Sequence, residues 1–224
     1  PSNRTDTRGI KRAQESIAQE EFSQAVRYLD EILARDEDSF LRVGHSGEFF
    51  GLKETAWKII RDLPEPGRQA YETTFGPAAG RLLKQCLIEG DYEGLRKLTQ
   101  RYFHSPAGHE AALLLAQYDA DLGRHLSAAL TYQELLDAPA AVARFEPQLS
   151  LQAALSWTAL GNRKRASELL QALGAAKYRS VRIGAEDVLL DFSNPGFLDK
   201  LLRKTGLPAN KDSIPESQWL TSRG

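Results

Sequence analysis

A turn followed by a helix with one apolar face recurs along the chain, and this pattern constrains the fold more than any other feature of the 224 residues. The turns fall at Glu20, Gly90, Gly123 and Gly161, at intervals of 70, 33 and 38 residues. After each turn, inward-pointing residues follow at steps of three and four, which places them on one helix face. A period of about 34 residues accounts for the first interval as two units and predicts stacked pairs of helices.

Composition favours helices over sheets. The sequence holds 28 Ala and 32 Leu but only 5 Val and 8 Ile. Ala and Leu lose little side-chain freedom in a helix, whereas strands favour the β-branched residues that are scarce here. A doubly wound or barrel enzyme, which needs buried strands rich in Val and Ile, is therefore not expected.

Charge and cysteine content exclude several further classes. The formal net charge is -1, so no net field attracts nucleic acid, and the basic clusters at 163–165 and 200–204 are interpreted as solvated helix faces. The single cysteine, Cys86, excludes an internal disulfide and any CxxC motif. Apolar runs are far shorter than the roughly 20 residues that span a bilayer, so we expect no direct membrane insertion.

Turn and cap signals predict where the helices begin and end. Ser105 before Pro106 is typical of an N-cap followed by proline at the first helical position. Val181 to Leu190 holds two of the five valines around a central turn, which predicts a small β-hairpin. Between 43 and 77 the repeat is lost among glycines and prolines. Helices are predicted at 52–61, 67–74, 106–122, 125–137, 147–160, 163–173 and 196–204.

The repeat resembles the tetratricopeptide repeat, whose second helix opens with Gly-x-Tyr-x-x-Ala. The match is best at Gly90 to Tyr92 and at Gly161 to Ala166. Small residues at Ala25, Ala128 and Ala166 would let the two helices of a hairpin approach closely, whereas Leu95 departs from the pattern. The resemblance implies an all-α, tetratricopeptide-like helical-hairpin solenoid, to which the β-hairpin near residues 181–190 is added.

A second resemblance covers nearly the whole chain. Its order of motifs is similar to the helical N-terminal region of exported bacterial proteins that carry a PQQ-binding-like, quinoprotein-like β-propeller. The motifs are Phe75-Gly76, Leu82-Leu83, Gly90 to Tyr92, Arg101 to His104, Ala107-Gly108, Ala128 to Leu130 and, resembling the entry into a first blade, Trp219 to Gly224.

This resemblance implies a division of the chain. Residues 1–174 would form the repeat domain, irregular at 43–77; residues 175–205 would form a hairpin and a short helix packed on its end; and 206–224 would lead toward an absent propeller. The chain has no methionine and begins at Pro1, so we expect a domain from a longer exported protein, periplasmic or associated with the cell envelope. The PQQ-binding residues would lie in the absent propeller, so no cofactor is expected here.

No catalytic or metal-binding constellation emerges from the motifs. His104 and His109 are five residues apart across the predicted cap, a hydrophobic-staple spacing rather than the spacing of metal ligands. Cys86 lies in an amphipathic helix, where a thiol behaves as a small apolar group. Gly44-His45-Ser46-Gly47 lacks the strand and helix that a phosphate-binding loop requires. We therefore expect neither an enzyme nor a metal site.

The leading hypothesis is a non-catalytic protein–protein interaction or scaffold domain. Solenoids bind protein or peptide partners on an extended concave face built from first-helix residues, and the partner here could equally be the propeller of the same chain. The candidate contact residues on the first helices are Glu110, Gln117, Asp121, Gln148 and Thr158. The alternative is an accessory domain of an enzyme whose catalytic, quinoprotein-like part lies C-terminal to residue 224.

Overall fold

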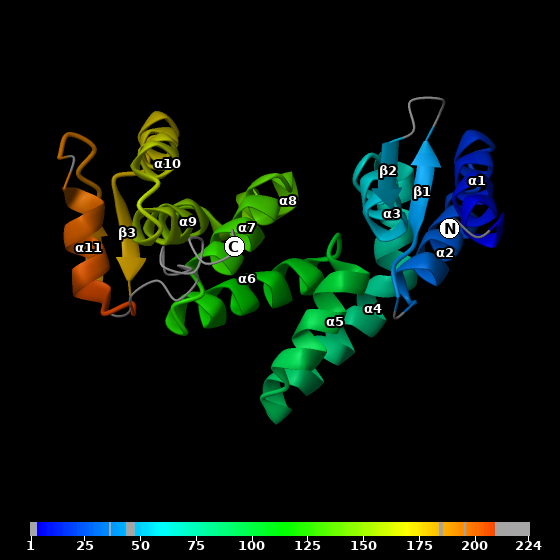
Figure 1. The fold of residues 1–224 in the computed structure, drawn as a ribbon, viewed down its shortest axis with the longest axis horizontal. Coiled ribbons are helices and arrows are strands. Elements are labelled where there is room, and N and C mark those ends of the chain that lie inside the picture. The colour runs from blue at the N-terminus through cyan, green and yellow to red at the C-terminus, as the bar shows by residue number, and fades with distance from the viewer. Residues whose placement is uncertain (1–3, 36, 44–47, 184–185, 195, 209–224) are drawn as a thin grey trace, which may run out of the picture. The chain divides into compact units, whose positions relative to one another are not determined.

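A computed structural model describes residues 4–35, 37–43, 48–183, 186–194 and 196–208 of the chain (Figure 1). The predicted linker from 209 onward, the motif from Trp219 to Gly224 and His45 lie outside these residues. Contacts divide the chain into two compact units, Pro1–Ala111 (unit 1) and Ala112–Gly224 (unit 2). The sequence places no boundary there, and its own division after residue 174 stays a prediction.

The described residues are mostly helical, which confirms the all-α class with a small β-hairpin. The elements are α1 (Arg4–Ala18), α2 (Phe22–Leu33), β1 (Phe40–Val43), β2 (Glu48–Gly51), α3 (Leu52–Arg61), α4 (Glu65–Glu89), α5 (Tyr92–Tyr102), α6 (Pro106–Asp121), α7 (His125–Leu136), α8 (Pro139–Phe145), α9 (Gln148–Ala159), α10 (Arg163–Ala175), β3 (Ser180–Ile183), β4 (Glu186–Leu189) and α11 (Phe197–Thr205).

The four predicted turns share one backbone conformation. Glu20, Gly90, Gly123 and Gly161 all have a left-handed φ, between 59° and 77°. Such a residue ends a helix by turning the chain out of it, and glycine adopts this conformation without steric cost. Two of the turns are followed at once by an N-cap, since the side chain of Asp91 accepts from the Gly94 N–H and that of Asn162 from the Arg165 N–H. The turn-helix pattern in the sequence therefore corresponds to left-handed turns that separate consecutive helices in the structure.

Unit 1 is built on the pairs α1–α2 and α4–α5, with α2 also packing on α3 and α4. The predicted helix at 67–74 is too short, because α4 continues to Glu89 through Pro77. A proline inside a helix removes one hydrogen bond. Buried residues at helical spacing, from Tyr71 through Ala79 to Cys86, hold the helix together across it.

The elements that the sequence did not predict include a hairpin in unit 1 and a helix in unit 2. Within the segment 43–77 and just before it, β1 and β2 pair antiparallel, with Phe40 opposite Gly51. In unit 2, α8 begins at Pro139, where the sequence places only the end of the preceding helix. A proline can mark either the end of one helix or the first turn of the next. From the sequence, Pro139 is interpreted as the end of the preceding helix, so α8 is not predicted.

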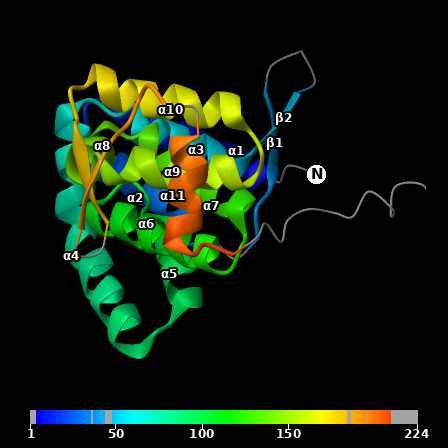
Figure 2. The same cartoon turned by 90° about the vertical axis from the view of Figure 1, so that its left-hand side faces the viewer.

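Unit 2 is organised around α9, which packs on α7, α10 and α11 (Figure 2). Its small residues Ala153 and Ala154, and Ala128 of α7, are fully buried, which lets α7 and α9 pack closely. The predicted hairpin is confirmed, with Ser180 of β3 opposite Leu189 of β4. No helix among the described residues of either unit is long and apolar enough to cross a membrane.

Candidate functional site

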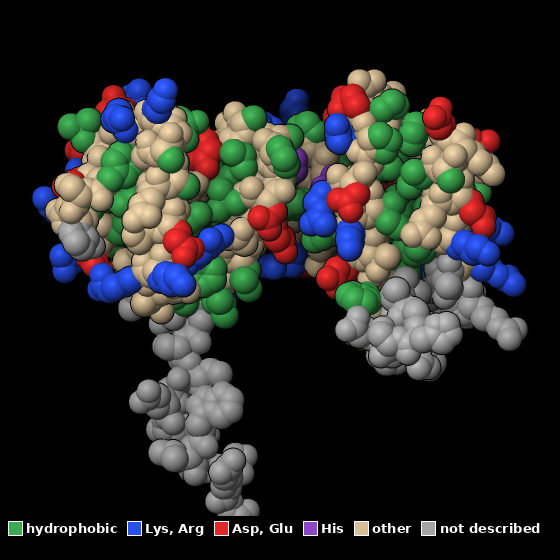
Figure 3. Space-filling view, turned by 90° about the horizontal axis from the view of Figure 1, so that it is seen from above, with side chains coloured by type: hydrophobic (Ala, Val, Ile, Leu, Met, Phe, Trp, Pro, Cys, Tyr) green, Lys and Arg blue, Asp and Glu red, His purple; other side chains and the backbone are tan. Residues whose placement is uncertain are grey.

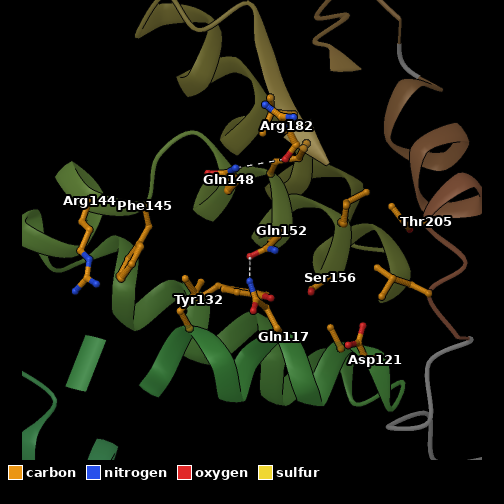
Figure 4. Close-up of a pocket in the computed structure, with 16 residues that line it drawn as sticks. Gln117, Asp121, Tyr132, Arg144, Phe145, Gln148, Gln152, Ser156, Arg182 and Thr205 are labelled. Atoms are coloured by element: carbon orange, nitrogen blue, oxygen red, sulfur yellow. Dashed lines mark hydrogen bonds between the residues drawn. The ribbon is translucent and has the colours of Figure 1, made fainter. Parts of the chain in front are cut away.

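Unit 2 contains a cavity of about 440 Å³ (Figure 4). Pockets that hold small ligands or short segments typically measure roughly 300–1,000 Å³. Its walls come from α6, α7, α8, α9, β3 and the end of α11. The lining residues are Leu113, Gln117, Ala120, Asp121, Tyr132, Arg144, Phe145, Gln148, Leu151, Gln152, Leu155, Ser156, Val181, Arg182, Thr205 and Leu207.

Helix α9 supplies a row of polar groups to this cavity. Gln148, Gln152 and Ser156 follow one another at steps of four residues, so they lie on one helix face. Leu151 and Leu155 line the cavity beside them. The wall therefore alternates hydrogen-bonding groups with apolar surface, which is the composition of a recognition site.

Two hydrogen bonds fix this row in place. The Gln117 Nε2 group on α6 donates to Gln152 Oε1 over 3.3 Å, which joins α6 to α9 at the cavity. The Gln148 Nε2 group donates to the Arg182 carbonyl, also over 3.3 Å, which joins α9 to β3 (Figure 4). The amides at the centre and at one end of the row are therefore oriented before any partner arrives.

Behind the cavity, a buried carboxylate ties α6 to α7. Asp119 is 3% exposed and accepts from Ser127 Oγ at 2.6 Å and from the Arg124 guanidinium at 3.4 Å. Beside it, burial raises the pKa of Tyr132, so this lining tyrosine stays a neutral phenol at physiological pH. The wall formed by α6 and α7 is thus held by a satisfied polar contact and a packed ring.

Another side of the cavity is closed by Thr205, at the end of α11, and by Leu207 in the chain that follows it. The fully buried ring of His125 lies with Nε2 2.8 Å from the Pro208 carbonyl oxygen. Because this contact joins residues far apart in the sequence, it positions the segment from Thr205 to Pro208 beside the cavity. His125 therefore serves both as a packing group and as an anchor for this segment.

The structure brings together three of the five contact residues proposed from the sequence. Gln117, Asp121 and Gln148 line the cavity, whereas Glu110 does not. Thr158 is also absent from the lining: it is buried, and its hydroxyl donates to the Ala154 carbonyl. The face of α9 that lines the cavity carries Gln148 and Ser156, which are separated by steps of four residues. Thr158 lies two residues beyond Ser156 and therefore on nearly the opposite side of the helix.

Among the polar lining residues, sequence reasoning missed Gln152, Ser156, Arg144, Arg182 and Thr205. Continuing the step of four from Gln148 would have found the first two. Arg144 lies at the end of the unpredicted helix α8, and its guanidinium lies 5.0 Å from the centre of the Phe145 ring. Arg182 comes from the hairpin, and nothing in the sequence indicates that this hairpin reaches the cavity.

The remaining candidates for chemistry, Cys86, His104 and His109, are packed against other side chains. Cys86 is buried, as predicted, and burial raises the pKa of its thiol. His104 and His109 each meet Phe103 edge-on, at 5.2 and 5.3 Å, and the described residues bring together no group of three or more metal-binding side chains. A hollow of about 430 Å³ over α2 is lined by that helix alone and has no opposing wall.

Three residues of the basic clusters in unit 2 are paired with acids. Arg163 forms an ion pair with Asp199, Arg165 with Glu168 at 3.1 Å, and Lys204 with Glu186. On the face shown in Figure 3, Lys and Arg side chains lie interspersed with Asp and Glu. This arrangement does not form the continuous basic stripe typical of nucleic-acid binding.

Comparison with protein-family models, with curated proteins and with solved structures finds no significant match for this chain.

Proposed function

We propose that this chain is a non-catalytic interaction or scaffold domain that binds a peptide segment of a protein partner in the cavity of unit 2. The observation that carries the proposal is the row of Gln148, Gln152 and Ser156, fixed by contacts to α6 and β3 and facing a cavity with apolar walls. The oriented side-chain amides can hydrogen-bond to the peptide groups of a bound segment, and the apolar surface between them can contact its side chains.

The chemistry of the lining supports recognition rather than catalysis. A serine nucleophile needs a base within hydrogen-bond reach. Ser156 is the only serine among the lining residues, and its hydroxyl has no hydrogen-bond partner. Asp121 is the only carboxylate among the lining residues, so no pair of carboxylates is present there for acid–base work.

A site-specific block tests the proposal. Gln148 is exposed at the cavity, and the single native thiol, Cys86, is buried, so a Gln148→Cys variant can be labelled selectively. Peptides captured by the full chain from a random display library should lose binding when a bulky maleimide sits at position 148. The same label on Gln171→Cys, exposed on α10 and outside the lining, should leave binding unchanged. Equal binding by both labelled proteins would refute the proposal.

Export and a following propeller remain separate proposals that rest on the sequence resemblance. An open reading frame that encodes a signal peptide upstream and repeated blade motifs downstream would support them. A stop codon directly after Gly224 would contradict the propeller.

A further inference from the structure

The Gln117–Gln152 pair has unused hydrogen-bonding capacity of a specific kind. A side-chain amide carries one acceptor oxygen and two N–H donors. Gln117 uses Nε2 to donate to Gln152 Oε1, and no other contact of either side chain is described. The Gln117 oxygen and the Gln152 nitrogen are therefore left as a neighbouring acceptor and donor. That combination complements a peptide group, which presents one N–H and one C=O.

Ser156 adds a second observation that points to a ligand. Its side-chain oxygen is buried, the residue is 1% exposed, and the hydroxyl has no hydrogen-bond partner. Burying a hydroxyl without a partner costs about 1–3 kcal/mol. Ser156 lies one helical turn beyond Gln152 on the cavity wall (Figure 4). A polar group of a bound segment would satisfy this hydroxyl.

Charge is unevenly distributed around this row. Arg182 and Arg144 lie on the Gln148 side of the cavity, and Asp121 lies on the Ser156 side (Figure 4). The Gln148 contact to the Arg182 carbonyl fixes the backbone that carries that guanidinium. Two guanidinium groups against one carboxylate give the lining a net positive charge, and the arginines concentrate it at one end. Arginine also presents paired donors that match a carboxylate.

We propose that the cavity binds an extended acidic peptide segment. One peptide group of the segment meets the Gln117–Gln152 pair, a polar group reaches Ser156, and an Asp or Glu side chain lies against Arg182. This inference rests on the proposed function and narrows it to one ligand class. An extended segment suits the site because its peptide groups are not already hydrogen-bonded within a helix.

The test uses acidic peptides and their amide counterparts, in which Asp and Glu are replaced by Asn and Gln, with the full chain. The acidic form should bind about tenfold more tightly, as expected when a hydrogen bond to a charged group is lost. Gln152→Glu keeps the acceptor that Gln117 uses but removes the free donor and adds a negative charge. It should weaken acidic peptides about tenfold or more, whereas Gln171→Glu on exposed α10 carries the same charge change and should not.

Two further pairs of matched variants separate the contributions of Arg182 and Ser156 to peptide binding. Arg182→Gln should remove the preference for acidic over amide peptides, while Arg179→Gln, exposed and outside the lining, should preserve it. Ser156→Ala should weaken binding several-fold, and Ser167→Ala on exposed α10 should not.

The possible failures are distinguishable. If captured peptides are blocked by the label at position 148 but show no acidic preference, the acidic assignment is wrong and the proposed function stands. If a label at position 148 has no effect on any peptide, the proposed function itself is wrong.

Discussion

Units 1 and 2 share the turn-helix pattern but fill the space between their helices differently. In unit 1, aromatic rings pack together: Phe75 lies 5.4 Å from Tyr71 and 6.0 Å from Tyr102, and Trp57 stacks on Phe103 at 5.5 Å. In unit 2, alanines bring α7, α9 and α10 close together, and the remaining space is a cavity lined by amides and a hydroxyl. The same turn-helix pattern can therefore surround either a ring-filled core or a cavity, depending on which large side chains lie between the helices.

The closest backbone approach in unit 1 gives the largest expected effect. A Cβ on Gly108 would lie 1.9 Å from the Tyr102 carbonyl oxygen, and the neighbouring Ser105 cap holds that turn, since its hydroxyl accepts from the Gly108 N–H. Gly108→Ala should lower the free energy of unfolding by about 3 kcal/mol or more, because the backbone rather than a side chain must move.

Gly80 in α4 is the matched control for this substitution. A Cβ there would meet nothing within 4 Å. Gly80→Ala should therefore raise the free energy of unfolding by about 0.5–1 kcal/mol through helix propensity. Urea unfolding of both variants measures the difference. Equal effects would show that the Tyr102–Gly108 turn is not packed as described.

The aromatic packing of unit 1 should make it sensitive to acid. Burial, and next the charge of His109, lower the pKa of His104 from 6.5 to about 4. Between these two pH values the unfolded chain binds a proton that the folded protein excludes, so the free energy of unfolding falls as the pH drops. The expected loss by pH 4 is about 3 kcal/mol.

His104→Phe should remove this contribution, because phenylalanine keeps a ring against Phe103 and does not titrate. Urea unfolding between pH 7 and pH 4 should therefore show that the free energy of unfolding falls less steeply with decreasing pH in the variant than in the wild type. Identical slopes for wild type and variant would exclude His104 as a source of the acid sensitivity.

Substitutions at the shared turns should change the stability of the protein in opposite directions in the two units. Glu20 has a φ of 59° in unit 1, where a side chain is strained, and Gly161 has a φ of 77° in unit 2. Glu20→Gly should stabilise the protein and Gly161→Ala should destabilise it, each by about 1 kcal/mol. Thermal unfolding of the two variants checks the signs. Two changes in the same direction would contradict the equivalence of these turns.

Unpartnered hydroxyls give the smallest effects on stability and the clearest functional contrast. Tyr71 in unit 1 and Ser156 in unit 2 each bury a hydroxyl without a hydrogen-bond partner. Tyr71→Phe and Ser156→Ala should each raise the free energy of unfolding by about 1 kcal/mol, because each change removes a buried hydroxyl that has no hydrogen-bond partner. Only Ser156→Ala should weaken peptide binding. Loss of binding in Tyr71→Phe would remove the functional distinction between the two units.

Much of the fold could be predicted, because turns and caps act locally. The turn glycines, the Ser105 cap and the helices beginning near Pro106 and Arg163 follow from short-range chemistry within a few residues. Pro77 and Pro139 show the limit, since a proline can interrupt, begin or lie inside a helix depending on packing that the sequence does not display.

The site was only partly predictable for a related reason. Gln117, Asp121 and Gln148 could be selected from helix phase. Arg182 and Leu207 could not, because they reach the cavity through contacts between residues distant in sequence, such as that between His125 and Pro208. Thr158 lies outside the cavity lining because the phase of α9 depends on which face packs against α7 and α10.

The central claim is that oriented glutamine amides in unit 2 bind an extended acidic peptide. The most direct measurement is an NMR titration of the full chain, with its side-chain amides assigned, using an acidic peptide selected by display. The account predicts saturable shifts of the Gln152 and Gln117 side-chain amide signals, with those of the exposed Gln171 unchanged. Tight binding that leaves the Gln117 and Gln152 signals unmoved would contradict it.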